Sequence, residues 1–540
     1  MSAYSASPST PRTTSRTPTP PRTTVVNVEE FEMDGRSIET KSADHVPIVF
    51  KANPFKHTYP ILRHTCFGVQ GKQTCEVRDT TTNPMFRDME EDDPQIQYVA
   101  KPFRSKSVQK PYRLRCGVMN YAWGKQSTDS AVAQWMQEGD PTYQVEQRPY
   151  AELWVGTHTN APSYMQESTG SSSNLVSENS SFANQSLHEF LQRNPATLGD
   201  AHTEQFGTDL PYLLKILSVA TALSIQAHPE KSHAERLHAS DPDHYPDPNH
   251  KPEAVVALSN YKAMCSFRPL PEIAHHLQTI DELRALVHED MVERFVTVVG
   301  SDGSSVEAKK EALKSIYMEL LLCDSARVQQ SIDAMTARLR NSTDLSWVES
   351  TFLDLTVQYP GDGGCFQVFF LNLIELKPGE GLFLAANEPH AYIHGDAVEI
   401  MARSDNVVRA GLTPKFKDHK VMGEMLSYDT QPLHIFRPNN EGPLTSYCPP
   451  PEYPDFKLLR VSLTEEWPGV SYELGKSSGC LLVTQGSATL LYCGKDCTIP
   501  TARLEVSVGS AYFLPSRLSV YFSRMTDFVA FIGECQIRAG

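Results

Sequence analysis

The stretch 223-LSIQAHP-229 combines the apolar alternation of a β-strand with two polar side chains that can bind a metal ion. Residues i and i+2 of a strand point to the same face of a sheet, so Gln226 and His228 present an amide oxygen and an imidazole together. A histidine in an apolar strand is often an ordinary core residue, so this pair alone does not establish a metal site. What the pair means therefore depends on the other polar groups of the chain.

Two further segments add possible ligands to this pair. The segment 250-HKPE-253 supplies a carboxylate behind a rigid proline turn, and 387-NEPH-390 supplies a second imidazole just after an apolar region. The candidate ligands are Gln226, His228, Glu253 and His390. Zinc accepts such nitrogen and oxygen ligands, and with one charged ligand it keeps about one net positive charge, which suits a Lewis acid. We therefore expect one zinc ion per chain.

Basic residues are grouped around these segments. They are Lys215 within the apolar run 213–217, Lys251 beside Glu253, and Arg409, Lys415 and Lys417 after His390. Arg409, Lys415 or Lys417 alone would be read as part of a solvated surface. On a chain of net charge −16, however, a local basic group beside a metal motif indicates a small anionic substrate. A lysine in an apolar run is costly to bury, which makes Lys215 a candidate functional residue.

The chain alternates between strand-like and helical patterns. Strand-like segments occupy 113 to about 266, then 366–376, 381–386 and 397–402, and again 455–538. Helical periodicity covers 272–348, with helices predicted at 280–299, 306–323 and 326–340 and a loop at 302–305. A β region, a helical insert and a second β region indicate a sandwich or jelly roll that carries a helical domain.

The composition excludes several classes of protein. The formal charge of −16 argues against a nucleic-acid-binding protein, because phosphate contacts need clustered Lys and Arg. No run approaches the roughly 18 apolar residues of a membrane span, and no apolar secretory segment begins the chain. The odd number of cysteines, 11, indicates reduced thiols, so we expect a cytoplasmic location. Residues 1–27, rich in Ser, Thr and Pro, are expected to be disordered.

Seven segments spread along the chain carry a resemblance to a known family. They are 120-NYAWGK-125, 149-PYAELWVGTH-158, 210-LPYLLK-215, 224-SIQAHP-229, 250-HKPE-253, 387-NEPHAY-392 and 409-RAGLTPK-415. In order and spacing they resemble type I mannose-6-phosphate isomerase (phosphomannose isomerase), a zinc enzyme of the cupin superfamily. The segment 124-GKQST-128 departs from the family by lacking a glycine after the lysine, and residues 1–112 have no counterpart in its compact members.

The resemblance implies a mainly β fold with α-helices, built from two cupin (jelly-roll) lobes and an inserted helical domain. The expected parts are an N-terminal extension (1–112), a catalytic cupin domain (113–270 and 350–440), a helical domain (271–349) and a C-terminal cupin lobe (441–540). The last lobe contains no histidine, so we expect no metal site of this kind there.

The resemblance also implies roles for individual residues. Gln226, His228, Glu253 and His390 would hold the zinc, Ser224, Lys251 and Lys415 would face the substrate phosphate, and Arg409 would be the catalytic arginine. The implied reaction interconverts mannose 6-phosphate and fructose 6-phosphate through a cis-enediol, supplying mannose for GDP-mannose synthesis and glycosylation. Arg409 would stabilise the enediolate charge, and either Glu399 or Lys215 would be the base.

Two other functions remain open at this point. An iron oxygenase would use two histidines and one carboxylate, and the extra amide of Gln226 counts against it. The presence of the expected ligands and of Arg409 argues against a non-catalytic sugar-phosphate-binding protein. For the isomerase we expect a small-molecule sugar phosphate as the partner, a monomeric chain, and neither nucleic acid nor membrane.

Overall fold

The computed structural model describes residues 109–166, 182, 184–438, 441–494, 500 and 502–538, together with the backbone of five short strands nearer the N-terminus. The chain divides into two compact units, Met1–Arg104 and Ser105–Gly540. In the first unit, β1 (Val25–Val26) pairs with β3 (Val49–Phe50), and β5 (Lys72–Val77) pairs with β2 (Ile38–Glu39) and β4 (His64–Val69). The disorder expected for residues 1–27 lies outside the described residues, apart from β1.

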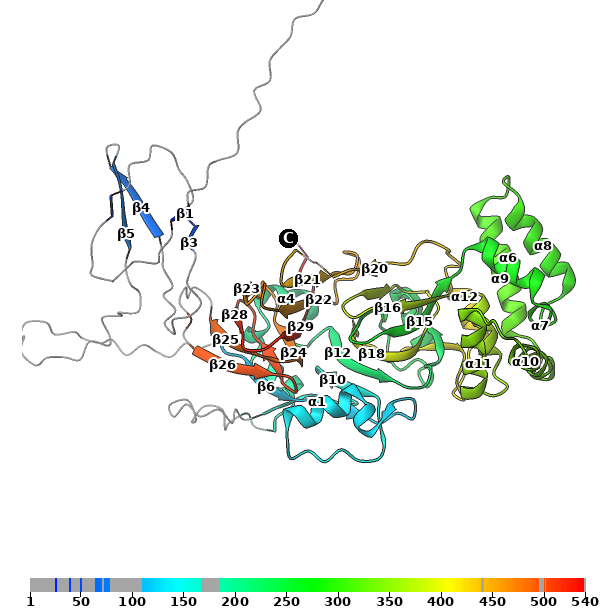
Figure 1. The fold of residues 1–540 in the computed structure, drawn as a ribbon, viewed down its shortest axis with the longest axis horizontal. Coiled ribbons are helices and arrows are strands. Elements are labelled where there is room, and N and C mark those ends of the chain that lie inside the picture. Colours follow the sequence, from blue (N-terminus) through cyan, green and yellow to red (C-terminus); the bar gives the residue numbers. More distant parts are fainter. Residues whose placement is uncertain are drawn as a thin grey trace, which may run out of the picture. The chain divides into compact units, whose positions relative to one another are not determined.

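Strand β18 (His390–Ala402) organises the first lobe of the second unit (Figure 1). Its first half pairs with β13 (Ile225–Ala227) and β15 (Tyr261–Phe267), and its second half lies between β12 (Tyr212–Val219) and β14 (Glu253–Ala257). Gly395 stands at the change of partners with φ +120°, where a Cβ atom would lie 2.5 Å from the carbonyl oxygen of Asn260. Only glycine fits this close approach, which lets one strand join two sets of partners around one interior.

Further strands extend this sheet. Along its main path the order is β20-β17-β14-β18-β12-β10-β7, with β16 paired to β15 and β19 paired to β13. The added strands are β7 (Gly117–Met119), β10 (Glu152–Val155), β16 (Leu371–Leu376), β17 (Gly381–Leu384), β19 (Val408–Gly411) and β20 (Ile435–Phe436). A separate pair is formed by β8 (Lys125–Gln126) and β9 (Pro149–Tyr150).

A second lobe contains two antiparallel sheets. The seven-stranded sheet has the order β11-β6-β27-β24-β29-β22-β21, and the four-stranded sheet has the order β23-β28-β25-β26. Their strands are β6 (Tyr112–Arg115), β11 (Tyr164–Met165), β21 (Leu444–Tyr447), β22 (Lys457–Leu463), β23 (Gly469–Glu473), β24 (Gly479–Gln485), β25 (Ser487–Cys493), β26 (Ala502–Ser507), β27 (Ala511–Leu514), β28 (Ser519–Arg524) and β29 (Phe528–Glu534). Thus β6 and β11, from the start of the second unit, are hydrogen-bonded into the sheet of the C-terminal lobe.

The two lobes share one hydrophobic core, and this core fixes which way β12 faces. Leu214 and Ile216 of β12 belong to the same buried cluster as Leu458 and Phe531 of the second lobe. Because side chains alternate along a strand, the odd-numbered residues of β12 point to the opposite face, into the interior of the first lobe. Lys215 is one of these.

One group of helices lies on the far side of the first lobe from the second lobe (Figure 1). This helical group comprises α6 (Leu270–Thr279), α7 (Asp281–Arg284), α8 (Glu289–Gly300), α9 (Val306–Leu321), α10 (Ser325–Arg340) and α11 (Trp347–Gln358). In the described part of the chain, α12 (His419–Met425) lies beside this group against α9, whereas other helices lie elsewhere, namely α1 (Ala131–Gly139), α3 (Leu187–Arg193), α4 (Asp200–Phe206) and α5 (Lys231–Ser240). Within the described part of the chain, no helix is long and apolar enough to cross a membrane.

Two sequence predictions need correction in this region. The helix predicted at 280–299 is divided into α7 and α8, because the intervening segment 285–288 leaves the helical path. The strand predicted at 366–376 begins only at Leu371, and the 3₁₀ helix η4 (Gly363–Phe369) precedes it. Asp362 begins η4 by accepting a hydrogen bond from the amide of Gly364. An apolar run that is buried on all sides has no periodicity to separate these structures.

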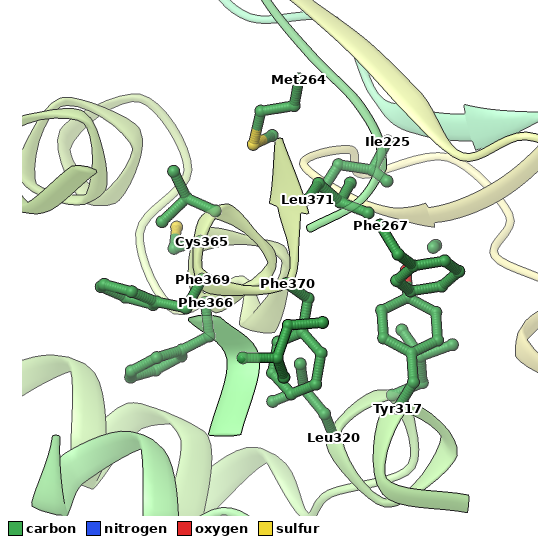
Figure 2. Close-up of a cluster of buried hydrophobic side chains, with 14 of the residues drawn as sticks. Ile225, Met264, Phe267, Tyr317, Leu320, Cys365, Phe366, Phe369, Phe370 and Leu371 are labelled. Atoms are coloured by element: carbon green, nitrogen blue, oxygen red, sulfur yellow. The ribbon is translucent and has the colours of Figure 1, made fainter. Parts of the chain in front are cut away.

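Figure 2 shows how the helical group is joined to the first lobe. Phe366, Phe369 and Phe370 of the η4 segment pack in one buried cluster with Tyr317 and Leu320 of α9. Ile225, at the start of β13, belongs to the same cluster. The strand that carries Gln226 is therefore anchored from behind by the helices. The domain boundaries expected from the sequence stay predictions.

Candidate active site

Charged side chains form a buried layer inside the first lobe. They are Glu152 of β10, Lys215 of β12, Glu253 of β14 and Glu399 of β18. Leu213 and Leu217, which flank Lys215 on the same face of β12, belong to two separate apolar clusters. The charges thus lie between two apolar zones. Because buried charges are stable only when they are paired or bind ions, this layer marks a functional site.

His228, Glu253 and His390 form a compact group at one end of this layer. His228 follows β13, Glu253 begins β14 and His390 begins β18. The Nε2 atom of His228 lies 3.2 Å from Oε1 of Glu253, and Nε2 of His390 lies 3.5 Å from its Oε2. All three side chains are buried, and their potential ligand atoms lie within 4.8 Å of one another. One ion is enough to contact all three.

Backbone carbonyls fix the orientation of both imidazoles. Nδ1 of His228 donates to the carbonyl oxygen of Asn406 at 2.7 Å, and Nδ1 of His390 donates to that of Glu388 at 3.0 Å. In the neutral form of each ring, Nε2 carries the lone pair, and both Nε2 atoms face the carboxylate of Glu253. Burial lowers the pKa of His228 to about 4, so this ring is neutral at pH 7.

This arrangement fits a metal ion. The Nε2 atom of His228 is buried and has no hydrogen-bond partner among the described residues. Lone pairs aimed at an ionised carboxylate repel it unless a cation lies between them. Deprotonated Nε2 atoms with Nδ1–H bound to a carbonyl are the usual state of metal-binding histidines. The donor set, two imidazoles and a carboxylate, is one that zinc accepts.

Two side chains hold Glu253 in place. The Tyr392 hydroxyl donates to its Oε2 at 3.0 Å, and the Lys251 ammonium nitrogen lies 3.6 Å from its Oε1. Burial opposes ionisation of Glu253, but its pKa lies well below the ordinary value, and the positive charge of Lys251 is one cause that favours the carboxylate. The carboxylate is thus ionised and ready to bind a cation.

Gln226 lies beside this group on β13. Its amide nitrogen is 3.4 Å from Nε2 of His390, and its oxygen accepts a hydrogen bond from the Ser224 hydroxyl at 3.5 Å. A 180° rotation of the amide exchanges the two atoms without moving the rest of the side chain. The predicted fourth ligand is therefore within reach of the site, and Ser224 lies next to it.

Lys215 is paired with two carboxylates. Its ammonium nitrogen lies 2.9 Å from Oε2 of Glu399 and 3.6 Å from Oε2 of Glu152. Burial alone would lower the pKa of Lys215, but Glu152 and Glu399 outweigh it and raise the pKa above its ordinary value. Burial raises the pKa of Glu399 to about 6, against the opposing effect of Lys215. Lys215 is therefore an ammonium ion, and Glu399 is a carboxylate that takes a proton readily.

The predicted basic residues differ in how far they are buried. Arg409 of β19 is directly opposite Gln226 of β13, is half-buried, and forms no ion pair with a described carboxylate. Lys415 is exposed, with its nitrogen 5.9 Å from the centre of the Tyr121 ring. Lys417 forms an ion pair with Asp362 at 3.2 Å, so its charge is already paired at the residue that begins η4. Arg409 and Lys415 are left available to an anion.

Some residues of this site were not predicted as members. Glu152 lies in 149-PYAELWVGTH-158, where an acid within an apolar run gives the same signal that singled out Lys215. Tyr392 follows His390 by two positions in a strand, so it shares its face. Tyr245 donates to Asp418 at 2.9 Å and interacts electrostatically with Arg409; its loop gave no such signal.

The structure combines paired β lobes, a helical insertion, and a metal-binding group beside a buried acid–lysine pair. These features together indicate a cupin-type enzyme with a metal centre. Comparison with known proteins narrows this class. The model of the phosphomannose isomerase type I catalytic domain matches residues 112–270, and that of its helical insertion domain matches 286–371.

Named relatives agree with these matches. Mannose-6-phosphate isomerase of Mus musculus is 38% identical over 421 residues, spanning 76% of this chain and 94% of the relative. The Saccharomyces cerevisiae enzyme is 36% identical over 431 residues, spanning 76% and 95%. A solved mutant of phosphomannose isomerase from Salmonella typhimurium has a TM-score of 0.64 and 28% identity, over 79% of this chain and 100% of that chain. A mannose 6-phosphate isomerase bound with zinc and yttrium has a TM-score of 0.62 and 28% identity, over 78% and 98%.

The chain therefore belongs to the type I phosphomannose isomerase family. The predicted cupin fold with a helical insertion and the predicted enzyme class, mannose-6-phosphate isomerase, are confirmed. This assignment selects the isomerase over the iron oxygenase and the non-catalytic binding protein.

Proposed function

We propose that this chain interconverts D-mannose 6-phosphate and D-fructose 6-phosphate through a cis-enediol, with one zinc ion held by Gln226, His228, Glu253 and His390. The fixed tautomers of the two histidines support a metal, and a related mannose 6-phosphate isomerase has been solved with zinc bound. When bound, the ion supplies Lewis-acid polarisation of substrate oxygens.

The contacts of Lys215 favour Glu399 as the base. A lysine that faces two carboxylates stays protonated and has no lone pair with which to accept a proton. Glu399, with a pKa raised to about 6, is close to the ideal for a base working near neutral pH. The 2.9 Å contact between these two residues is the observation that carries the assignment.

In the proposed reaction, Glu399 accepts the proton from C2 of the open-chain mannose 6-phosphate. The electrons of the C2–H bond form the C1–C2 double bond, and the C1 oxygen takes the negative charge. Arg409 stabilises this charge. The hydroxyl proton of O2 then passes to O1, and Glu399 returns its proton to C1, which gives fructose 6-phosphate.

Ser224, Lys251 and Lys415 are proposed to face the substrate phosphate. Lys415 is exposed and suits the first contact with an incoming anion. Lys251 is buried beside Glu253, so its ammonium group would be shared between this carboxylate and the substrate. A cytoplasmic location, a monomeric state, a lack of nucleic-acid partners and a role in supplying GDP-mannose stay predictions.

A coupled isomerase assay tests the metal and the activity together. The protein is assayed as purified, after chelation, and after zinc is added back, and its metal content is measured at each stage. We expect activity to fall with the metal and to return with one zinc per chain. Full activity in protein shown to be metal-free would contradict the proposal.

A further inference from the structure

We propose that Glu152 is a positioning residue, which holds the Lys215 ammonium so that Glu399 keeps one oxygen free to accept the substrate proton. This inference rests on the proposed role of Glu399 as the base. It adds a residue that acts through Lys215 and not on the substrate.

The geometry around Lys215 is the first argument. Its ammonium nitrogen lies 2.9 Å from Oε2 of Glu399 and 3.6 Å from Oε2 of Glu152, so the two carboxylates share one cation. Trp154 stands directly across from Lys215 in the pairing of β10 with β12, and its ring centre is 5.1 Å from the ammonium nitrogen. The cation is thus confined between two carboxylates and an aromatic face.

Glu152 is itself held in place. Glu152 and Trp154 are two residues apart on β10, so they share a face, and the Trp154 indole N–H donates to Oε2 of Glu152. This oxygen is also the one nearest to Lys215. Trp154 therefore fixes both the carboxylate and the cation, on a strand whose residues are all buried.

The charge balance gives Glu152 its effect. The two carboxylates of Glu152 and Glu399 and the ammonium ion of Lys215 together carry a net charge of −1. With Glu152 present, Lys215 divides its attraction between two acids, and Glu399 retains basicity. Without Glu152, the ammonium ion pairs with Glu399 alone, which neutralises the base and lets it turn toward the lysine.

The test is the variant Glu152→Gln, which keeps the shape of the side chain and removes its charge. We expect kcat to fall on the order of 10²-fold, the cost of a small misplacement in an active site, with KM little changed. In a plot of kcat against pH, the fall on the acid side should move to lower pH, because the pKa of Glu399 drops when a neighbouring negative charge is lost. Glu152→Asp, which keeps the charge, should recover part of the activity.

The C-terminal lobe offers a matched control in Glu534. This carboxylate is also buried, also accepts a hydrogen bond from an aromatic residue, Tyr472, and also pairs with a lysine, Lys457, at 3.5 Å. Glu534→Gln should reduce stability without changing kcat or its fall on the acid side. An equal loss of kcat in the two variants would mean that Glu152 has only a structural role, and overturn the proposal.

Two more variants separate the possible outcomes. Glu399→Gln is assayed in parallel. If Glu399→Gln remains active, Glu399 is not the base. If Glu399→Gln is inactive but Glu152→Gln is fully active, only the positioning role of Glu152 is overturned. If Glu152→Gln does not fold, Trp154→Phe keeps the ring over Lys215 and removes the donor to Glu152. It should lower kcat in the same direction, and an unchanged kcat would overturn the proposal.

Discussion

The Tyr392 hydroxyl donates a hydrogen bond to Oε2 of Glu253 at 3.0 Å, on the same strand face that carries His390. The hydrogen bond leaves Oε1 of Glu253 directed at Nε2 of His228, 3.2 Å away. A tyrosine thus orients the carboxylate of the metal-binding group. Loss of such a supporting contact typically lowers metal affinity by about 10- to 100-fold.

Tyr392→Phe should weaken metal binding by about 10- to 100-fold, because Glu253 loses the donor that holds its position. The affinity is measured by competition with a chromogenic zinc chelator. The ring of Tyr392 packs in the apolar cluster around Leu217 and Val255, so phenylalanine preserves the packing. An unchanged zinc affinity would show that the hydroxyl is not needed to orient Glu253.

Glu399→Gln should lower kcat on the order of 10²- to 10⁴-fold, the usual contribution of a general base, while zinc content stays unchanged. Lys215→Arg keeps a cation between the two carboxylates and should retain more activity than Glu399→Gln. Rates are compared under saturating substrate. If Lys215→Arg proves inactive while Glu399→Gln turns over normally, the lysine is the base and the assignment is reversed.

Arg409→Ala should reduce turnover by about 10²- to 10³-fold, the range found when one group that stabilises developing negative charge is removed. Zinc should stay bound, because Arg409 approaches the site from β19 and is not one of the ligands. Metal analysis and kcat are determined on the same preparation. Near-normal turnover would remove Arg409 from the mechanism.

Lys415 and Lys417 provide a paired test of phosphate recognition. Lys415 stands over the Tyr121 ring, whereas Lys417 is engaged by Asp362. Lys415→Ala should raise KM severalfold and make the remaining affinity less sensitive to salt, since an exposed charge acts through a screened field. Lys417→Ala should leave KM near the wild-type value. Equal effects of both variants would indicate a diffuse basic surface and no specific contact.

The activity should fall on the acid side as Glu399 takes up a proton. Its pKa is raised to about 6 by burial, by Glu253 and by Glu152, against Lys215, while Tyr261 also faces it from β15. The base works only when deprotonated, so kcat/KM should be level above about pH 6 and fall about tenfold per unit below it. Metal content is checked at each pH, since loss of zinc gives a different slope. A level profile down to pH 5 would exclude Glu399.

Much of the site could be predicted because its residues stand out from their surroundings. Lys215 is conspicuous in an apolar strand, and the ligand residues are chemically distinctive wherever they occur. The supporting contacts were harder to predict. The carbonyl oxygen of Asn406 that fixes His228 carries no side-chain signal, and the pairing of Glu152 with Lys215 depends on the register of β10 and β12.

The fold, like the site, has parts that the sequence predicts and parts that it does not. Periodicity predicts the order of β, helical and β regions, because helix and strand repeats differ wherever one face is polar. The sequence pattern of the η4 segment is that of a strand, because nearly all of its residues are buried and it has no polar face to reveal a helical repeat. The place of β6 in the C-terminal sheet could not be predicted, since pairing partners far apart in sequence leave no local pattern.

The pairing of β6 with β27 has a consequence for how the protein is made. Leu114 is paired with Met165 of β11 on one side and with Ala511 of β27 on the other, so β6 gains its second neighbour only when the last part of the chain has been synthesised. Until then, on a translating ribosome, the unpaired edge of β6 and the apolar outer face of β12 have no partners. We therefore expect the catalytic lobe to complete its folding late and to depend on chaperones while the chain emerges.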